Sequence, residues 1–260
     1  MSDSIIFEKI GGVGKITLNR PDSYNSFTRE MALRMQDTLD KCKDDREIRA
    51  VYLTGNGKAF CAGQDIKELL DPENTIGLER IVPEHYNPII EKILNLPKPV
   101  VCGVNGVAAG AGANLALMCD VTLATKSASF IQAFTKIGLI PDSGGTYSLP
   151  RLVGFQKAIA LAMLGDKVMA DEAERMGMIY KYYDDETFAE DTFAVAVKLS
   201  NMPTKALAYT KELFNRSLTN SFEEQLQLEA VYQTMAGNTA DYKEGIAAFV
   251  EKRKPTFKGE

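Results

Sequence analysis

Residues 104–117 read VNGVAAGAGANLAL, in which glycine and alanine alternate directly before a short apolar run. The pattern predicts a loop that opens into a helix beginning near Ala111. The first amides of a helix have no partner within it and carry the positive end of its dipole, so they suit a developing negative charge. Close packing of a helix on a strand also uses glycine and alanine, so the loop alone does not decide between the two readings.

A second segment rich in small residues, KAFCAGQDIKEL at 58–69, lies where a strand is expected to end and a helix to begin. The amide of Gln64 would then lie at the start of the helix. Asp65 as the cap of an ordinary tight turn is the alternative. Two such loops could supply the two donors that hold an enolate oxygen, each contributing several kcal/mol when preorganised.

A carboxylate lies in the third glycine-rich segment, GLIPDSGGT at 138–146. Burial of Asp142 beside Leu139, Ile140 and Phe134 would raise its pKa by desolvation and make it a better base. The alternative is that Asp142 only caps the turn, which is a common role of aspartate. One acid beside an oxyanion site indicates proton movement next to a carbonyl group.

Composition excludes several classes of protein. The chain is 45% hydrophobic and 25% charged, the balance of a soluble globular protein, and its 260 residues allow one large domain or two small ones. A net charge of -5 gives no reason to expect nucleic acid as a partner. Residues 1–8 lack the pattern of a secretory signal, and no run approaches the roughly 18 apolar residues of a membrane span. A cytoplasmic protein without a membrane partner is expected.

Histidine and cysteine usage favours metal-free chemistry. The single histidine, His85, excludes His-rich zinc sites and leaves one possible base for a Ser-His-Asp triad. The cysteines have no C-x-x-C spacing and are expected to be reduced core residues. They are Cys42, Cys61, Cys102 and Cys119.

Strands alternate with helices in the first part of the chain, which predicts an α/β fold with a largely parallel sheet. Strands are expected at 5–10, 14–18, 50–54, 99–104 and 119–124, the first two as a hairpin. Helices are expected at 28–42, 155–164, 170–176, 187–199, 204–217, 221–235 and 239–250. The helical last part is either a separate domain or an arm used for assembly.

Four ordered motifs resemble those of the enoyl-CoA hydratase/isomerase (crotonase) superfamily over nearly the full chain. They are AFCAGQDIKEL at 59–69, VNGVAAGAGANLALMCD at 104–120, FIQAFTKIGLIPDSGGT at 130–146 and AFVEKRKPTF at 248–257. The resemblance implies a spiral of ββα turns over residues 1–200. It also implies a C-terminal helical region, residues 201–260, that builds a homotrimer and often a hexamer of two trimers.

The resemblance also implies an acyl-CoA thioester whose enolate is held by the backbone amides of Gln64 and Ala111. No separate cofactor is expected, because coenzyme A is part of the substrate. The terminal helix, often from a neighbouring subunit, is expected to reach the adenosine and phosphates of CoA. The residues expected to bind substrate or CoA are Ala62, Asp65, Ile66, Lys67, Gly110, Phe249 and Lys252.

Hydratases that resemble this chain carry two glutamates, which would fall at Asn114 and Phe134. Neither asparagine nor phenylalanine can act as a general acid or base in this role. Asp142 then remains as the acid–base group, in a turn similar to that of the superfamily's ring-epoxide isomerases. We therefore expect an isomerase, with conversion of ring-epoxidised phenylacetyl-CoA to its oxepin as the leading reaction.

Three alternatives stay open. A Δ3,Δ2-enoyl-CoA isomerase of β-oxidation would use the same residues on another acyl group. An enoyl-CoA hydratase would need a second acid that the sequence does not identify. A catalytically silent chain could bind acyl-CoA as a subunit of a pathway complex.

His85 has a possible functional role of its own. A related class of dehalogenases pairs an aspartate near this turn with a histidine on the preceding helix. His85 lies on that helix but about two positions out of register, which on a 3.6-residue helix would point it elsewhere. A partly exposed structural histidine is the favoured expectation.

Overall fold

A computed structural model describes residues 3–70 and 76–260. The N-terminal Met1 and Ser2 lie outside it, and so do residues 71–75. The sequence between Leu70 and Pro88 is expected to contribute to the acyl pocket, and residues 71–75 of that segment are outside the described part. Within the described residues, no helix is long and apolar enough to cross a membrane.

The larger sheet has six strands in the order β1-β2-β3-β5-β7-β10. The first two form the predicted antiparallel hairpin, and from β2 onward the pairing is parallel. The strands are β1 (Ile5–Ile10), β2 (Val13–Leu18), β3 (Ala50–Gly55), β5 (Val100–Val104), β7 (Val121–Thr125) and β10 (Lys181–Tyr183).

A second sheet of four short strands was not predicted, and its order is β4-β6-β8-β9. Successive turns of the chain add one strand to each sheet, as β3 and β4, β5 and β6, then β7 and β8, and this is the expected ββα spiral. The strands are β4 (Ala59–Cys61), β6 (Val107–Ala109), β8 (Ser129–Ile131) and β9 (Lys167–Met169). Three residues are too few to show an alternating pattern.

The helices follow the predicted ranges closely where polar caps mark their first residues. Thr28 caps the first long helix through Met31 N, and Ser221 forms a capping box with Glu224. The helices are α1 (Arg29–Asp44), α2 (Ile66–Leu69), α3 (Leu78–Ile81), α4 (Asn87–Asn95), α5 (Ala111–Leu117), α6 (Gly145–Val153), α7 (Phe155–Leu164), α8 (Ala170–Arg175), α9 (Phe188–Ser200), α10 (Thr204–Ser217), α11 (Phe222–Gly237) and α12 (Ala240–Val250). Two 3-10 turns, η1 (Pro21–Ser23) and η3 (Ala133–Ile137), and one π-helix, η2 (Val82–Tyr86), complete the set.

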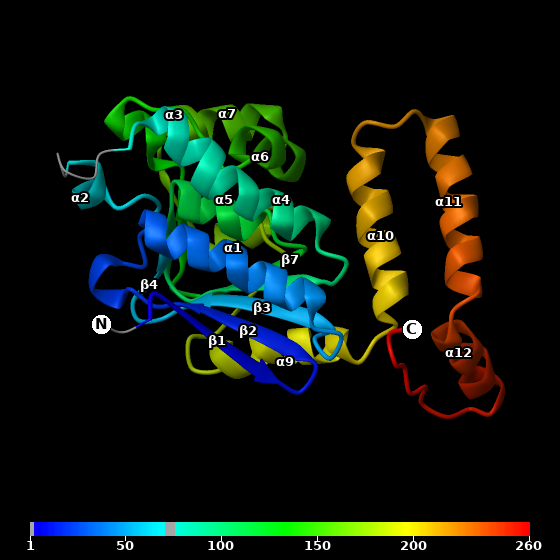
Figure 1. Ribbon diagram of the computed structural model, residues 1–260. Helices are drawn as coiled ribbons and strands as arrows, with labels where there is room; N and C mark the ends of the chain where they lie inside the picture. The colour runs from blue at the N-terminus through cyan, green and yellow to red at the C-terminus, as the bar shows by residue number, and fades with distance from the viewer. Residues whose placement is uncertain (1–2, 71–75) are drawn as a thin grey trace.

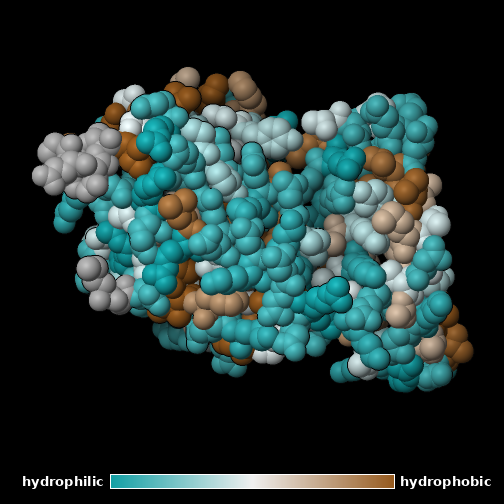
Figure 2. Space-filling view, viewed as in Figure 1, coloured by the Kyte–Doolittle hydropathy of each residue, from teal (hydrophilic) through white to brown (hydrophobic). Residues whose placement is uncertain are grey.

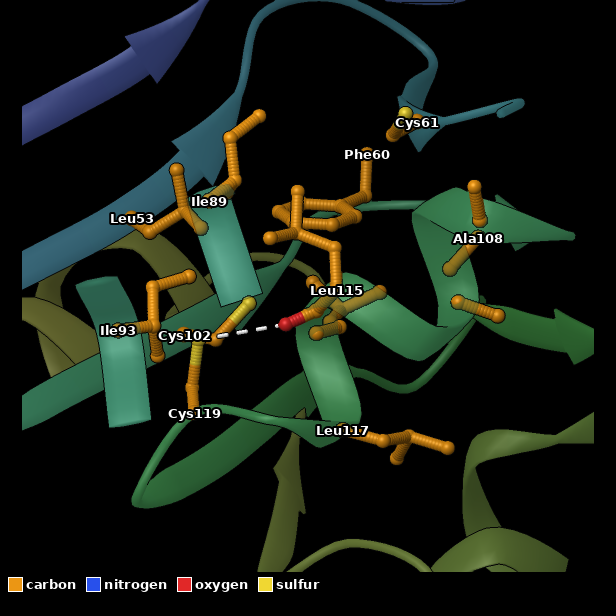
Figure 3. Close-up of a cluster of buried hydrophobic side chains, with 14 of the residues drawn as sticks. Leu53, Phe60, Cys61, Ile89, Ile93, Cys102, Ala108, Leu115, Leu117 and Cys119 are labelled. Carbon is orange, nitrogen blue, oxygen red and sulfur yellow. Dashed lines mark hydrogen bonds between the residues drawn. The ribbon is translucent and has the colours of Figure 1, made fainter. Parts of the chain in front are cut away.

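The main core lies between the two sheets and the helices α1, α4 and α5. Leu115 of α5 packs there with Phe60 of β4, Leu53 of β3 and Ile89 of α4 (Figure 3). Burying one such side chain contributes about 1.5–3 kcal/mol. This packing fixes the start of α5 relative to the end of β4, the two places from which the candidate site is built.

The helices α10, α11 and α12 form an arm beside the spiral (Figure 1). Lys211 of α10 joins the arm to the core by donating to Asp120 at 2.9 Å and to the carbonyl of Ile93 at 2.7 Å. Arg49 donates to the Thr204 hydroxyl and the carbonyl of Phe257. These hydrogen bonds fix the arm to its own core.

Candidate active site

The first small-residue loop leaves β4 and is held by a short bridge to Phe27. Phe27 N donates to the carbonyl of Gly63 at 2.7 Å, and Asp65 N donates to the carbonyl of Phe27 at 2.9 Å. The peptide of Gln64 is fixed between these two bonds. Within the described residues, the amide of Gln64 itself donates to no other group of the chain.

The second loop ends where predicted, because α5 begins at Ala111. Among the described groups, the Ala111 amide likewise has no acceptor. The two loops touch at Gly63, whose φ is +90°, since a methyl group built there would lie 3.4 Å from Ala111 N and 3.2 Å from the Ala109 carbonyl. Two free amides therefore lie on adjoining loops, which is the arrangement an oxyanion requires.

Asp65 caps the helix that follows its loop, which is the alternative role expected for it from the sequence. Its buried carboxylate accepts from Arg20 Nη2 at 2.8 Å and from Lys67 N at 3.0 Å, which caps α2. Burial alone would raise the pKa of Asp65, but the hydrogen bonds from Arg20 and from the Lys67 amide outweigh it and lower the pKa. A carboxylate held ionised in this way is a poor proton acceptor.

Asp142 has the opposite electrostatic environment. Its half-buried carboxylate accepts from the Ser143 hydroxyl at 2.9 Å, and burial raises its pKa above the ordinary value, as predicted. The residue at the N-cap of α6 is Gly144, and no side chain caps that helix. The expected contribution of Ile140 to this burial is wrong, because 79% of its side chain is exposed in the single chain.

The two positions expected to replace hydratase acids lie on either side of this turn. Asn114 is fully buried on α5, and its Nδ2 donates to the carbonyl of Asp142 at 2.8 Å. Phe134 is also buried, and a methyl group built on Gly110 would lie 3.8 Å from its Cζ. Both side chains thus border the start of α5, and neither can exchange a proton.

A partly buried polar network around Tyr86 was not predicted. The Tyr86 hydroxyl donates to Gln64 Oε1 at 2.8 Å, and Gln64 Nε2 donates to Glu68 at 2.9 Å. The pKa of Tyr86 is raised well above its usual value, first by burial and also by the nearby Asp142 carboxylate. Tyr86 is thus hydrogen bonded to the Gln64 loop and lies within electrostatic reach of Asp142. Only the folded chain brings these residues together, and no local pattern signals them.

The prediction for His85 was wrong about its exposure, because 1% of the residue is accessible. It lies on the π-helix η2, where a register counted at 3.6 residues per turn does not hold. Its Nε2 accepts from Arg29 Nη1 at 3.0 Å, and burial, helped by Arg29, lowers its pKa. His85 is thus a neutral residue of the α1–η2 contact.

The expected CoA-binding residues fall into two groups that this chain does not bring together. Ala62, Ile66 and Lys67 are exposed on the Gln64 loop and α2. Phe249, 84% exposed, and Lys252 lie at the end of α12, on the arm and away from α2 and α5 (Figure 1). Across the described ranges, no cluster of three or more metal-ligating side chains is found, and all four cysteines are buried and free.

Comparison with known proteins extends over the whole chain. The family model described as enoyl-CoA hydratase/isomerase matches residues 8–260. The chain is 45% identical, over all of both chains, to a protein of Escherichia coli K12 named 1,2-epoxyphenylacetyl-CoA isomerase. It is 43% identical, over 98% of each chain, to a Rhodobacter capsulatus protein named as a probable enoyl-CoA hydratase.

Solved structures give the same result for the fold. The crystal structure of an enoyl-CoA hydratase from Bacillus anthracis superposes with a TM-score of 0.92 at 32% identity, covering 99% of this chain and all of that one. The two sheets and the C-terminal helices are thus a crotonase-like arrangement. Isomerase and hydratase names both occur among the relatives, so the choice between them depends on the residues of the site.

Proposed function

The chain belongs to the enoyl-CoA hydratase/isomerase family, and from this premise we propose that it is an isomerase of acyl-CoA thioesters with Asp142 as its acid–base group. One observation carries the proposal. Asp142 is a half-buried carboxylate with a raised pKa, and its backbone is hydrogen bonded to α5, the helix that begins at the free Ala111 amide. The free Gln64 amide lies on the adjoining loop.

The reaction needs only one proton carrier. Asp142 removes a proton from the carbon next to the thioester, and the electron pair moves onto the thioester oxygen to form an enolate. The amides of Gln64 and Ala111 stabilise that oxygen. Asp142 then returns the same proton to a different carbon. No atom is gained or lost, so the step needs neither water nor a cofactor.

Hydration is disfavoured by the state of the other polar groups. Adding water takes a base for the water and an acid for the carbon. Asn114 cannot ionise and its amide is already hydrogen bonded to Asp142 and Gln132, while Asp65 is held ionised by Arg20. These contacts support isomerase over hydratase.

The name of the Escherichia coli relative supports ring-epoxidised phenylacetyl-CoA as the substrate, with its oxepin as product. A 3-enoyl-CoA, isomerised to the 2-enoyl ester, is the second candidate because the same residues would serve it.

Incubating the protein with a panel that includes both esters and crotonyl-CoA, in deuterated water with mass-spectrometric detection, tests the proposal. Isomerised product is expected, and where the proton on Asp142 exchanges with solvent before its return, deuterium should appear on the carbon that receives it. Hydration of crotonyl-CoA as the fastest reaction would contradict the proposal, and tight binding without exchange would favour a silent binding subunit.

We further propose that the chain divides at about residue 200 and that the arm, residues 201–260, assembles it into a homotrimer or a hexamer of two trimers. The support is the apolar surface of the arm (Figure 2), which includes Phe214, Phe222, Val231 and Phe249, all more than half exposed. Exposed apolar area of this kind is typical of a protein interface. In such an assembly Phe249 and Lys252 would contact the CoA of a neighbouring subunit.

A further inference from the structure

Asn114 uses both ends of its side-chain amide, deep inside the protein. Its Nδ2 donates to the carbonyl of Asp142 at 2.8 Å, and its Oδ1 accepts from Gln132 Nε2 at 2.8 Å. Asn114 has no exposed surface and Gln132 only 4%. Because a buried amide without hydrogen-bond partners is unfavourable, these two bonds hold the Asn114 side chain in one orientation.

The turn that carries Asp142 lies directly on this amide. The Asp142 carbonyl accepts a second hydrogen bond from Gly145 N at 2.8 Å. A methyl group built on Gly145 would lie 2.1 Å from Asn114 Nδ2, so only glycine allows this approach. The backbone of Asp142 is thus held from both sides, while among the described residues its carboxylate has one side-chain partner, Ser143.

Asn114 also shares a rigid element with the oxyanion donor. Ala111 is the first residue of α5, and Asn114 N donates to the carbonyl of Gly110 at 3.1 Å in the first turn of that helix. The same turn of helix therefore carries the donor for the enolate oxygen and the contact that fixes the Asp142 backbone. The spacing between base and oxyanion donor is then set through Asn114, and misplacement by about 1 Å costs roughly 100-fold in rate.

We propose that Asn114 is a positioning residue for Asp142 and that Gln132 supports it by holding Oδ1 of the Asn114 side chain. The inference rests on the proposed function of Asp142 and deepens it. The Asp142 carbonyl can only accept a hydrogen bond, so it requires Nδ2 of Asn114 and leaves Oδ1 for the donor of Gln132. Oε1 of Gln132 has no partner among the described residues, so Asp142 orients the Asn114 amide and Gln132 steadies it.

The test compares three variants on the best ester from the panel. Asn114→Leu keeps the branching of the side chain and removes its donor, whereas Gln132→Met removes the donor to Oδ1 of Asn114 together with the unpaired Oε1. Thr122→Val is the matched control, because the buried Thr122 hydroxyl donates to the Ala116 carbonyl of α5 at 2.7 Å without contacting the Asp142 turn. For each we would measure kcat, KM, the pH profile of kcat/KM and the melting temperature.

Asn114→Leu is expected to lower kcat about 10- to 100-fold with little change in KM. The acidic limb of its pH profile should move to lower pH, because a released carboxylate gains solvation that lowers its pKa. Tyr86 of η2 is the titratable neighbour whose ionisation senses Asp142, and it stays in place in all three variants. Gln132→Met should lower kcat and shift the acidic limb in the same directions by smaller amounts. Thr122→Val should lower only the melting temperature.

Wild-type kcat and an unshifted acidic limb in folded Asn114→Leu would overturn the role of Asn114. An unaffected Gln132→Met would overturn the role of Gln132, and an equal kinetic loss in Thr122→Val would make both effects merely structural. If Asn114→Leu does not fold, Gln132→Met still decides. The variant Asp142→Asn distinguishes failure of the proposed function from failure of this inference. If Asp142→Asn stays active, the proposed function fails. If it is inactive while Asn114→Leu and Gln132→Met match wild type, only this inference fails.

Discussion

The hydroxyl of Tyr86 donates a 2.8 Å hydrogen bond to Oε1 of Gln64, the residue whose backbone amide is left free for an oxyanion. Gln64 Nε2 is held in turn by Glu68, and both oxygens of Glu68 accept from the amide of Arg29 at the start of α1. The side chain of Gln64 is therefore restrained at both ends. This restraint limits how far its peptide can rotate away from a bound substrate.

Replacing Tyr86 by phenylalanine should reduce kcat by roughly 3- to 10-fold, the effect of about 1 kcal/mol from one lost hydrogen bond. The melting temperature should also fall, because Oε1 of Gln64 loses its partner in a buried site. Tyr52→Phe is the matched control, since that buried hydroxyl bonds Thr192 of α9 on the other face of the large sheet. It should lower the melting temperature without changing kcat, and equal kinetic losses in the two variants would show that the Tyr86 contact has no special role.

Asp142→Asn should abolish turnover, with a loss of at least about 100-fold, since general acid–base catalysis typically contributes 100- to 10,000-fold. Binding of the CoA ester should be nearly unchanged, because asparagine has the same shape and Nδ2 of Asn114 contacts only the Asp142 backbone. Steady-state assays and calorimetric titration with the ester measure the two quantities. A variant with wild-type-like rates would rule out Asp142 as the proton carrier.

The same substitution should stabilise the protein at neutral pH. Burial raises the Asp142 pKa in the folded state above its ordinary value of 3.8, so the neutral acid is favoured by folding. Below pH 3.8 the residue is neutral in both folded and unfolded chains and carries no penalty. The penalty grows as the pH rises from 3.8 to the folded pKa, because the unfolded chain ionises first, and it stays constant above the folded pKa.

Melting temperatures of wild type and Asp142→Asn, measured from pH 3.5 to 8, should therefore diverge as the pH rises, with the variant higher. The acidic limb of kcat/KM in wild type should lie above pH 3.8 for the same reason, because only the ionised base accepts the proton. Parallel melting curves across this range would mean that the carboxylate is solvated as freely as in an unfolded chain.

Much of the fold could be predicted from local signals in the sequence. Apolar periodicity and the caps at Thr28, Ser221 and Thr239 mark the long helices, and α7 and α10 begin and end at the predicted residues. The second sheet could not be predicted in this way, because its strands have three residues each and form only by pairing with distant segments.

The site shows the same division between local and long-range information. The free amide of Ala111 follows from a helix that begins there, which the glycine-rich run indicates. The contacts from Gln132 to Asn114 and from Asn114 to Asp142 span 18 and 28 residues, and no pattern within one element encodes them. The exposure of His85 was predicted wrongly for a different reason. The prediction assumed 3.6 residues per turn, and the π-helix η2 does not follow that periodicity.

The arm provides the last prediction. Phe249 and Lys252 lie at the end of α12 on the arm, and Figure 1 shows α12 away from α2 and α5 of the same chain, so a role in CoA binding requires that they reach a neighbouring subunit. Lys252→Glu should then raise KM for the ester with little effect on kcat, because a remote contact to phosphate strengthens ground state and transition state alike. Lys258→Glu, near the C-terminus of the same arm, is a control for the change in charge.

Complementation between two defective chains tests the geometry directly. Asp142→Asn and Lys252→Glu chains would be purified separately and also co-expressed with different tags, and the mixed oligomers assayed at a substrate concentration well below the wild-type KM. If the arm serves a neighbouring subunit, some sites combine an intact Asp142 from one chain with an intact Lys252 from the other. The mixture should then exceed the activity of the Lys252→Glu protein, counted per intact Asp142.

If the arm serves its own chain, every site contains one defect and mixing does not increase the activity. A monomeric wild-type protein in solution would contradict the proposed assembly before any mixing is done.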